Sequence, residues 1–155
     1  MSLASVRADL AERAPDIEIV EAGRSTATVA LAAAAHGVEP GRIAKTLSLR
    51  LDGAVILLVM SGTARLDNRK FKDRFATKPK MLGADEVQGA TGHPVGGVCP
   101  FGLATPLPVY CDVSLREFDI VYPAAGSLNS SVQVTPDRLA QLVSTAWVDV
   151  CRLRE

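Results

Sequence analysis

The pattern of hydrophobic and polar positions is clearest in the middle of the chain, where it predicts a β-hairpin. Apolar and polar residues alternate over 43–51, which is typical of a strand with one buried face. The turn residues Asp52 and Gly53 follow, and residues 54–60 form a continuous apolar run. A run of this length between turn signals indicates a central strand that is buried on both faces.

Shorter patterns on either side of this hairpin alternate between helical and strand periods, without internal repeats or a linker. Helical spacing ends before Pro15 in the first segment, and the last helix begins at Thr135-Pro136, where proline suits the first turn. Helices are expected from Leu3 to before Pro15, at 26–35, 66–75 and 84–90, and from 135 onward. Further strands are expected at 17–20, 107–113, 120–122, 131–134 and 147–151. About seven strands and four or five helices predict a mixed α/β fold, with residues 1–155 as one domain.

The composition excludes several broad classes of protein. Apolar residues make up 48% of the 155 residues and charged residues 22%, which is a core-forming composition. The 17 basic and 17 acidic residues cancel, so binding of nucleic acid by bulk charge is excluded. The longest apolar run is far shorter than the roughly 20 residues of a membrane span, so no membrane partner is expected. Three widely spaced cysteines and the charged start of the chain predict reduced thiols in a cytoplasmic protein.

Residues 83–102 contain six of the 12 glycines and form the most unusual stretch of the chain. The part that follows the predicted helix, residues 92–102, is the glycine-rich loop. Glycine permits positive φ angles and close approach to a ligand, and the prolines stiffen the segment. The main-chain amides of such a loop can hold a phosphate or a developing oxyanion, although a long surface turn is the alternative interpretation. Leu103 and Ala104 stand where a nucleotide-binding P-loop requires Lys and Ser or Thr, so an NTPase is not expected.

Lys45 is the second candidate, because it lies within the predicted strand 43–51 between Ile43 and Leu47 on the same face. A lysine on an apolar face needs a partner or access to solvent. It is therefore either an ordinary lysine at the end of a strand or a cation at the floor of a pocket. Cys99 lies in the glycine-rich loop and is a conceivable nucleophile, but no Ser or Cys nucleophile motif accompanies His93.

Two further segments have polar or basic character. Residues 127–131 read Ser-Leu-Asn-Ser-Ser and are either an ordinary turn or donors to a ligand. Residues 65–80 carry seven basic and two acidic side chains, a local charge of +5. This predicted helix is either a solvated face or a contact for nucleic-acid phosphates, for which Arg69, Lys70 and Lys72 are the candidates.

Three of these segments together resemble the YbaK/EbsC family, which comprises the editing domain of prolyl-tRNA synthetase and its free-standing relatives. The resemblance extends from about residue 26 to residue 143. It is carried by IAKTL at 43–47, GHPVGGVCPFG at 92–102 and AGSLNSSVQVTPDRL at 125–139.

The resemblance implies a distorted mixed-sheet barrel flanked by helices, and an enzyme that deacylates mischarged tRNA. Lys45 matches the functional lysine of the family, and the loop glycines Gly96 and Gly97 match the motif whose amides face the aminoacyl carbonyl. Water attack assisted by the substrate's own ribose hydroxyl is implied, with no cofactor and no metal. The residues expected to contact the substrate are Thr46, His93, Val98, Cys99, Pro100, Phe101, Ser127, Asn129 and Ser131.

The implied partner is the acceptor end of a mischarged tRNA, with an aminoacyl-tRNA synthetase as a further candidate. Alanine, serine, threonine and cysteine are the candidate amino acids. Several relatives carry an acidic residue at the position of Ser131, and its absence here alters recognition of the amino group or of the terminal nucleotide. The alternative hypotheses are a non-catalytic module that binds tRNA ends or a nucleotide, and a thiol-dependent hydrolase or redox protein that uses Cys99.

Overall fold

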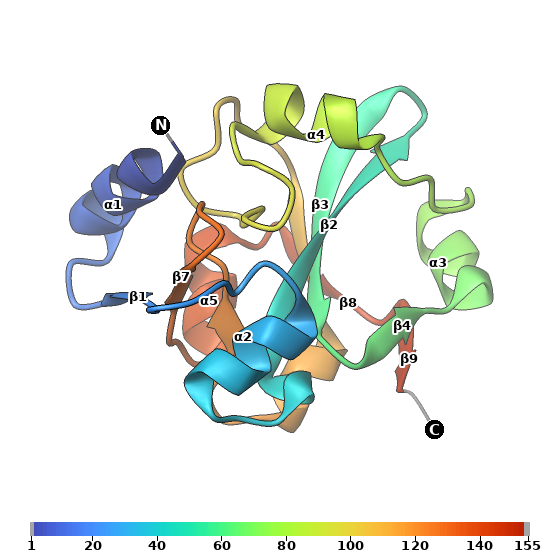
Figure 1. Ribbon diagram of the computed structural model, residues 1–155. Helices are drawn as coiled ribbons and strands as arrows, with labels where there is room; N and C mark the ends of the chain where they lie inside the picture. The colour runs from blue at the N-terminus through green and yellow to red at the C-terminus, as the bar shows by residue number, and fades with distance from the viewer. Residues whose placement is uncertain (1, 154–155) are drawn as a thin grey trace.

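The structure is a computed structural model that describes residues 2–153. Five α-helices and nine strands are present in this range, with two 3₁₀ turns (Figure 1). The helices are α1 (Ser2–Arg13), α2 (Val29–His36), α3 (Asn68–Phe75), α4 (Ala84–Thr91) and α5 (Pro136–Val143), and the 3₁₀ turns are η1 (Pro40–Arg42) and η2 (Val113–Glu117). The strands are β1 (Ile19–Glu21), β2 (Ile43–Leu51), β3 (Ala54–Ser61), β4 (Ala64–Leu66), β5 (Val109–Asp112), β6 (Tyr122–Pro123), β7 (Ser130–Val132), β8 (Ala146–Val148) and β9 (Cys151–Leu153).

A mixed sheet with the strand order β6-β2-β3-β5-β8 forms the centre of the molecule. The hairpin β2–β3 is antiparallel, whereas β6, β5 and β8 each add in parallel. An isolated bridge between Ala124 and Ser131 continues the sheet from β6 to the antiparallel pair β7–β1. The result is a curled sheet that closes halfway to a barrel, with helices around it (Figure 1). The predicted mixed α/β barrel flanked by helices is thereby confirmed.

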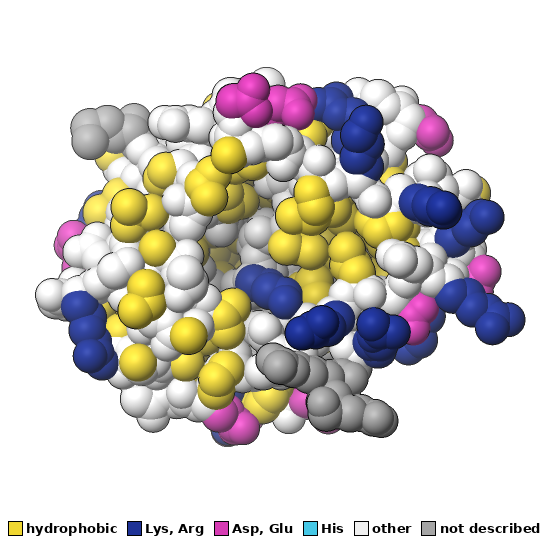
Figure 2. All heavy atoms as spheres, turned by 45° about the vertical axis from the view of Figure 1, so that its right-hand side comes forward, with side chains coloured by type: hydrophobic (Ala, Val, Ile, Leu, Met, Phe, Trp, Pro, Cys, Tyr) yellow, Lys and Arg dark blue, Asp and Glu magenta, His cyan; other side chains and the backbone are white. Residues whose placement is uncertain are grey.

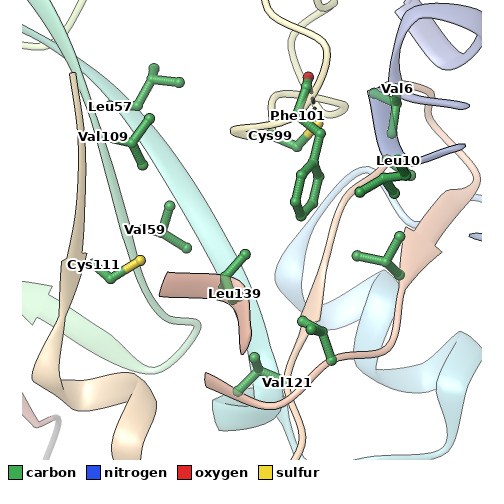
Figure 3. Close-up of a cluster of buried hydrophobic side chains, with 14 of the residues drawn as sticks. Val6, Leu10, Leu57, Val59, Cys99, Phe101, Val109, Cys111, Val121 and Leu139 are labelled. Atoms are coloured by element: carbon green, nitrogen blue, oxygen red, sulfur yellow. Dashed lines mark hydrogen bonds between the residues drawn. The ribbon is translucent and has the colours of Figure 1, made fainter. Parts of the chain in front are cut away.

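Strand β3 divides two hydrophobic cores, which explains its continuous apolar sequence. Leu57 and Val59 belong to the core inside the curled sheet, to which α1 and the glycine-rich loop also contribute side chains (Figure 3). Ile56, Leu58 and Met60 point to the opposite side, toward a core that includes residues of α3. Because successive side chains of a strand alternate between faces, an apolar residue is required at every position.

The two largest differences from the predicted elements concern β8, β9 and β4. The single strand expected at 147–151 is two strands, β8 and β9, which belong to different sheets. The buried Asp112 holds the bend between them by accepting the main-chain N–H of Val150 at 2.8 Å. Strand β4 was not predicted, because it spans three residues and is stabilised mainly by pairing with β9, far away in the sequence. No helix within residues 2–153 is long and apolar enough to cross a membrane.

Candidate active site

The cavity that contains the leading candidates lies along one edge of β2. Strand β6 covers this edge at Ile43 and Ala44, and residues 80–82 cover it again from Ser48 onward. Between these two contacts the edge opens into a cavity of about 330 Å³, which α2, α4 and the glycine-rich loop enclose. The volume falls within the range of small-molecule sites. The stretch of β2 that has no strand paired on this edge, residues 45–47, therefore forms part of the cavity wall.

Lys45 lies in the open stretch of β2 and lines the cavity. Its ammonium donates hydrogen bonds to the carbonyl oxygens of Ala64 at 2.8 Å and Gly62 at 3.4 Å. No carboxylate forms a salt bridge with it within residues 2–153. Burial lowers the pKa of Lys45 from 10.5, and the positive charge of Arg65 lowers it further. The cavity therefore contains a cation that no carboxylate within residues 2–153 neutralises, and this cation can bind an anionic or carbonyl group of a ligand.

The glycine-rich loop contributes its main chain to the same cavity. Gly96 has φ +91°, and both Gly96 and Val98 line the cavity. The amide of Gly97 donates to the carbonyl of Pro94 at 2.9 Å, so it is already used within the loop. Among residues 2–153, no acceptor takes a hydrogen bond from the amide of Gly96 or Val98. These N–H groups remain to receive a ligand oxygen, together with that of Val95, which also lines the cavity and has no acceptor within the same range.

The side chains of His93, Cys99 and Phe101 face the interior instead of the cavity. All three are fully buried, and Cys99 and Phe101 belong to the core inside the curled sheet (Figure 3). His93 Nε2 donates to the carbonyl oxygen of Phe101 at 2.7 Å, and its Nδ1 accepts from the hydroxyl of Ser2. These residues anchor the loop to α1 and to the core. Pro100 is buried too and borders a different hollow, beside α1.

Burial also determines the protonation of the loop side chains. It raises the pKa of the Cys99 thiol to about 12, so the thiolate needed for nucleophilic attack does not form near neutral pH. Burial lowers the pKa of His93 from 6.5. Because the carbonyl of Phe101 can only accept, Nε2 carries a proton, and the lowered pKa favours the neutral ring, in which Nδ1 accepts from Ser2. The arrangement therefore disfavours the hydrolase that was hypothesised to use Cys99.

The buried neutral His93 predicts a specific dependence of stability on pH. The unfolded chain takes up a proton at this residue below about pH 6.5, and the folded protein does not. The free energy of unfolding should therefore fall as the pH is lowered from 6.5, by up to about 1.4 kcal/mol per pH unit for this group. Urea unfolding between about pH 5 and 6.5, above the carboxylate range, measures this slope. His93→Gln should flatten it, and an equal slope in both proteins would contradict the assignment.

The polar segment 127–131 is divided between the cavity and a supporting turn. Ser131 lines the cavity. Ser127 and Asn129 hydrogen-bond to each other, and Asn129 Nδ2 donates to the carbonyl oxygen of Ala22 at 3.2 Å. They fasten the segment before α2 and do not line the cavity. Thr46 lines the cavity, and its hydroxyl oxygen is buried without a hydrogen-bond partner among residues 2–153.

Much of the cavity wall was not anticipated from the sequence. Its sides come from the start of α2, the segment before α4 and β6, and include Thr26, Val29 and Tyr122. Met81 and Val95 also line it, although 56% and 59% of their surface is exposed. Figure 2 shows the hollow with hydrophobic side chains around it. Apart from Val95, which lies in the motif at 92–102, these residues belong to no motif, and residue type alone does not mark them as part of a site.

The three predicted phosphate contacts lie on α3, outside the cavity lining. Phe71 anchors this helix in the second core, and the basic side chains point to solvent. Lys70 donates to Asp149 and to the carbonyl oxygen of Cys151, each at 3.1 Å, whereas Arg69 and Lys72 are exposed without an ion pair among residues 2–153. Within the same range, no group of three or more His, Cys, Asp or Glu side chains is placed to hold a metal ion.

Comparison with known proteins identifies the family to which this fold and cavity belong. The family model of the aminoacyl-tRNA editing domain matches residues 24–142, which include the whole β2–β3 hairpin and the glycine-rich loop. The chain belongs to the aminoacyl-tRNA editing domain family. The predicted relationship with this family is thereby confirmed.

Some relatives align with this chain over nearly their full length, and others are much longer proteins that align over one part. YwhH, an uncharacterized protein of Bacillus subtilis (strain 168), is 47% identical, and the alignment covers 98% of each chain. A proline–tRNA ligase of Moorella thermoacetica is 34% identical, and there the alignment covers 73% of this chain but 20% of the ligase. A crystal structure provisionally described as a trans-editing enzyme for prolyl tRNA synthetase superimposes with a TM-score of 0.89 at 32% identity, covering 97% of each chain.

Proposed function

We propose that this editing domain acts as a free-standing deacylase, which hydrolyses the ester between a wrongly attached small amino acid and the 3′-terminal adenosine of a tRNA. One observation carries the proposal: the Lys45 ammonium and the available amides of Gly96 and Val98 line the same cavity. Membership of the editing-domain family and the likeness to the structure described as a trans-editing enzyme support it.

In this proposal, Lys45 anchors the aminoacylated adenosine. Its ammonium keeps two carbonyl partners and has donor capacity left for the ester or the ribose. The amides of Gly96 and Val98 receive the oxyanion that develops on the ester carbonyl. One well-placed donor of this kind contributes roughly 3–4 kcal/mol to stabilising the transition state. The loop glycine Gly97 contributes indirectly, since its own amide holds the turn.

The hydrolysis needs little acid–base chemistry from the protein, because an aminoacyl ester is already reactive. Water attacks the carbonyl carbon, the bond to the ribose oxygen breaks, and this oxygen leaves with a proton. The neighbouring ribose hydroxyl of the substrate orients the water and relays the proton. Holding water and ester in the geometry of attack supplies several kcal/mol more. The roles of His93, Cys99, Pro100 and Phe101 are then to fix the loop.

The lining of the cavity supports a small amino acid as substrate. Alanine side chains and Val29, Val87 and Val98 form much of the wall, and Thr46 and Ser131 offer hydroxyl groups. An apolar pocket discriminates between side chains that differ by one methylene by only about 1–3 kcal/mol. We therefore expect overlapping activity on neighbouring members of the set alanine, serine, threonine and cysteine.

A panel of mischarged tRNAs tests the proposal directly. We expect rapid deacylation of at least one of the alanyl, seryl, threonyl and cysteinyl esters on tRNA for proline, with the correctly charged prolyl-tRNA spared. Loss of the labelled amino acid from acid-precipitable tRNA measures the rate. Tight binding without turnover of any ester would instead favour the non-catalytic module that binds tRNA ends.

A further inference from the structure

Two arginines face each other on the short ribbon formed by β4 and β9. In the antiparallel register, Arg65 pairs with Arg152. Directly opposite residues of a β-ribbon project to the same side, with Cβ atoms about 5 Å apart. Ala64 and Cys151 are buried on the inner side of the ribbon, and both arginines are exposed on the outer side. The ribbon therefore presents two guanidinium groups side by side.

In the part of the chain that the structure describes, these two arginines lack the salt bridges that most other arginines form. Elsewhere in the described part of the molecule most arginines form salt bridges, namely Arg7, Arg13, Arg42, Arg50, Arg116 and Arg138. Neither Arg65 nor Arg152 forms one within residues 2–153. Asp67 lies close enough to feel the charge of Arg152, but its Oδ1 accepts the amides of Arg69 and Lys70 that begin α3.

Like charges placed directly opposite each other destabilise a β-ribbon, and an anion bound between two cations reduces their repulsion. Two adjacent guanidinium groups match the geometry of a phosphate, to which each can donate parallel hydrogen bonds. The ribbon is therefore suited to bind an anion of this kind.

The pair also lies beside the cavity that contains Lys45. The ammonium of Lys45 donates to the carbonyl oxygen of Ala64, the residue that precedes Arg65 in β4. Arg65 is close enough for its charge to lower the pKa of Lys45. Figure 2 shows Lys and Arg side chains gathered along one side of the hollow. A ligand that enters the cavity and carries a phosphate outside it would meet the two arginines.

We propose that Arg65 and Arg152 form a clamp for a phosphodiester in the single-stranded 3′ end of the tRNA. The proposal rests on the function proposed above, which seats the terminal adenosine beside Lys45. The phosphates of the preceding nucleotides then continue out of the cavity toward the β4–β9 ribbon. The clamp thus selects a nucleic-acid end over a free amino-acid ester. The clamp is separate from the α3 residues Arg69, Lys70 and Lys72, which are candidates to contact phosphates of the acceptor stem.

Binding of an uncharged acceptor-stem microhelix that ends in CCA tests the clamp, measured by fluorescence anisotropy at several salt concentrations. For Arg65→Gln/Arg152→Gln we expect about tenfold weaker binding. The slope of log K against log salt should decrease by about 0.7 for each single-strand phosphate that the variant no longer neutralises. On a microhelix without the CCA end, the variant should bind as the parent protein does. Lys70→Glu/Lys72→Glu should instead weaken binding to both microhelices.

Two controls keep the result interpretable. Arg7→Gln/Arg138→Gln changes the net charge equally at exposed ion pairs on α1 and α5, and should leave affinity and slope unchanged. The melting temperature of Arg65→Gln/Arg152→Gln should equal or exceed that of the parent, since a like-charge repulsion is removed. Should it fall, Arg65→Lys/Arg152→Lys retains the charge and should bind less tightly than the parent, with most of the salt slope preserved.

Parental affinity and slope on the CCA microhelix would overturn the clamp, and so would equally weakened binding to the microhelix without CCA. Because binding needs no turnover, the result is independent of the deacylation panel. A failed panel together with selective weakening of CCA binding would refute the proposed reaction and leave the clamp in place. If the parent deacylates an ester in the panel and the variant binds the CCA microhelix as tightly as the parent, the proposed reaction is supported and the clamp is refuted.

Discussion

Replacing Lys45 by alanine should lower kcat/KM for deacylation of mischarged tRNA by on the order of 10³-fold. A hydrogen bond from a charged donor contributes about 1.5–3 kcal/mol, and loss of the anchor also misplaces the ester relative to the loop amides. The fold should be unaffected. Burial disfavours the charged form of Lys45, so the melting temperature of the variant should equal or exceed that of the parent. Initial rates on the ester identified by the panel measure the effect.

Lys78→Ala is the matched control for this experiment. Lys78 is exposed, does not line the cavity and forms no salt bridge within residues 2–153. Its replacement changes the net charge by the same amount and should alter the rate by less than about twofold, because one screened surface charge contributes little. Full activity of Lys45→Ala would remove this lysine from the mechanism.

Replacing Gly96 by alanine should reduce deacylation by about 10²-fold. At φ +91° an added Cβ is strained, and it would lie 3.0 Å from Ala27 Cβ and from Leu128 Cδ2. The loop must shift to relieve both effects, and a displacement of about 1 Å in an active site costs roughly 10²-fold in rate. Because the loop amides receive the oxyanion in this mechanism, the effect should appear mainly in kcat.

Gly89→Ala provides the comparison, because Gly89 lies within α4 and an added Cβ meets no atom within 4 Å. This variant should retain activity and be more stable by about 0.5–1 kcal/mol, since alanine favours the helix. That corresponds to an increase of a few degrees in melting temperature for a domain of this size. Equal rates for Gly96→Ala and the parent would show that the loop amides are not in the catalytic geometry.

The agreement between sequence and structure was best where local pattern and tertiary environment demand the same residues. The hairpin β2–β3 was predicted within one residue, because its strands are long and its turn residues distinctive. Helix α2 ends at His36, one residue beyond the predicted range 26–35, because Gly37 adopts the left-handed conformation that terminates a helix. Short strands such as β4 and β9 carry no such pattern, since pairing between distant segments and burial determine them.

In the candidate site too, some features were predicted from the sequence and others depend on the tertiary structure. Lys45 and the glycine-rich loop were singled out from residue type and spacing, and the structure brings Lys45, Gly96 and Val98 to one cavity. Their roles in catalysis remain predictions. The inward orientation of His93 and Cys99 could not be foreseen, because a polar residue in a loop motif looks the same whether it faces a ligand or the core.

By itself, the sequence determined the family, the central hairpin and the residue types available for chemistry, because these depend on local periodicity and on motifs. Only the tertiary structure decided which loop amides remain available, which side chains support the loop from behind, and that Arg65 and Arg152 stand opposite each other. These features arise from interactions between segments up to about ninety residues apart, and such interactions are set by burial and strand pairing that no local pattern records.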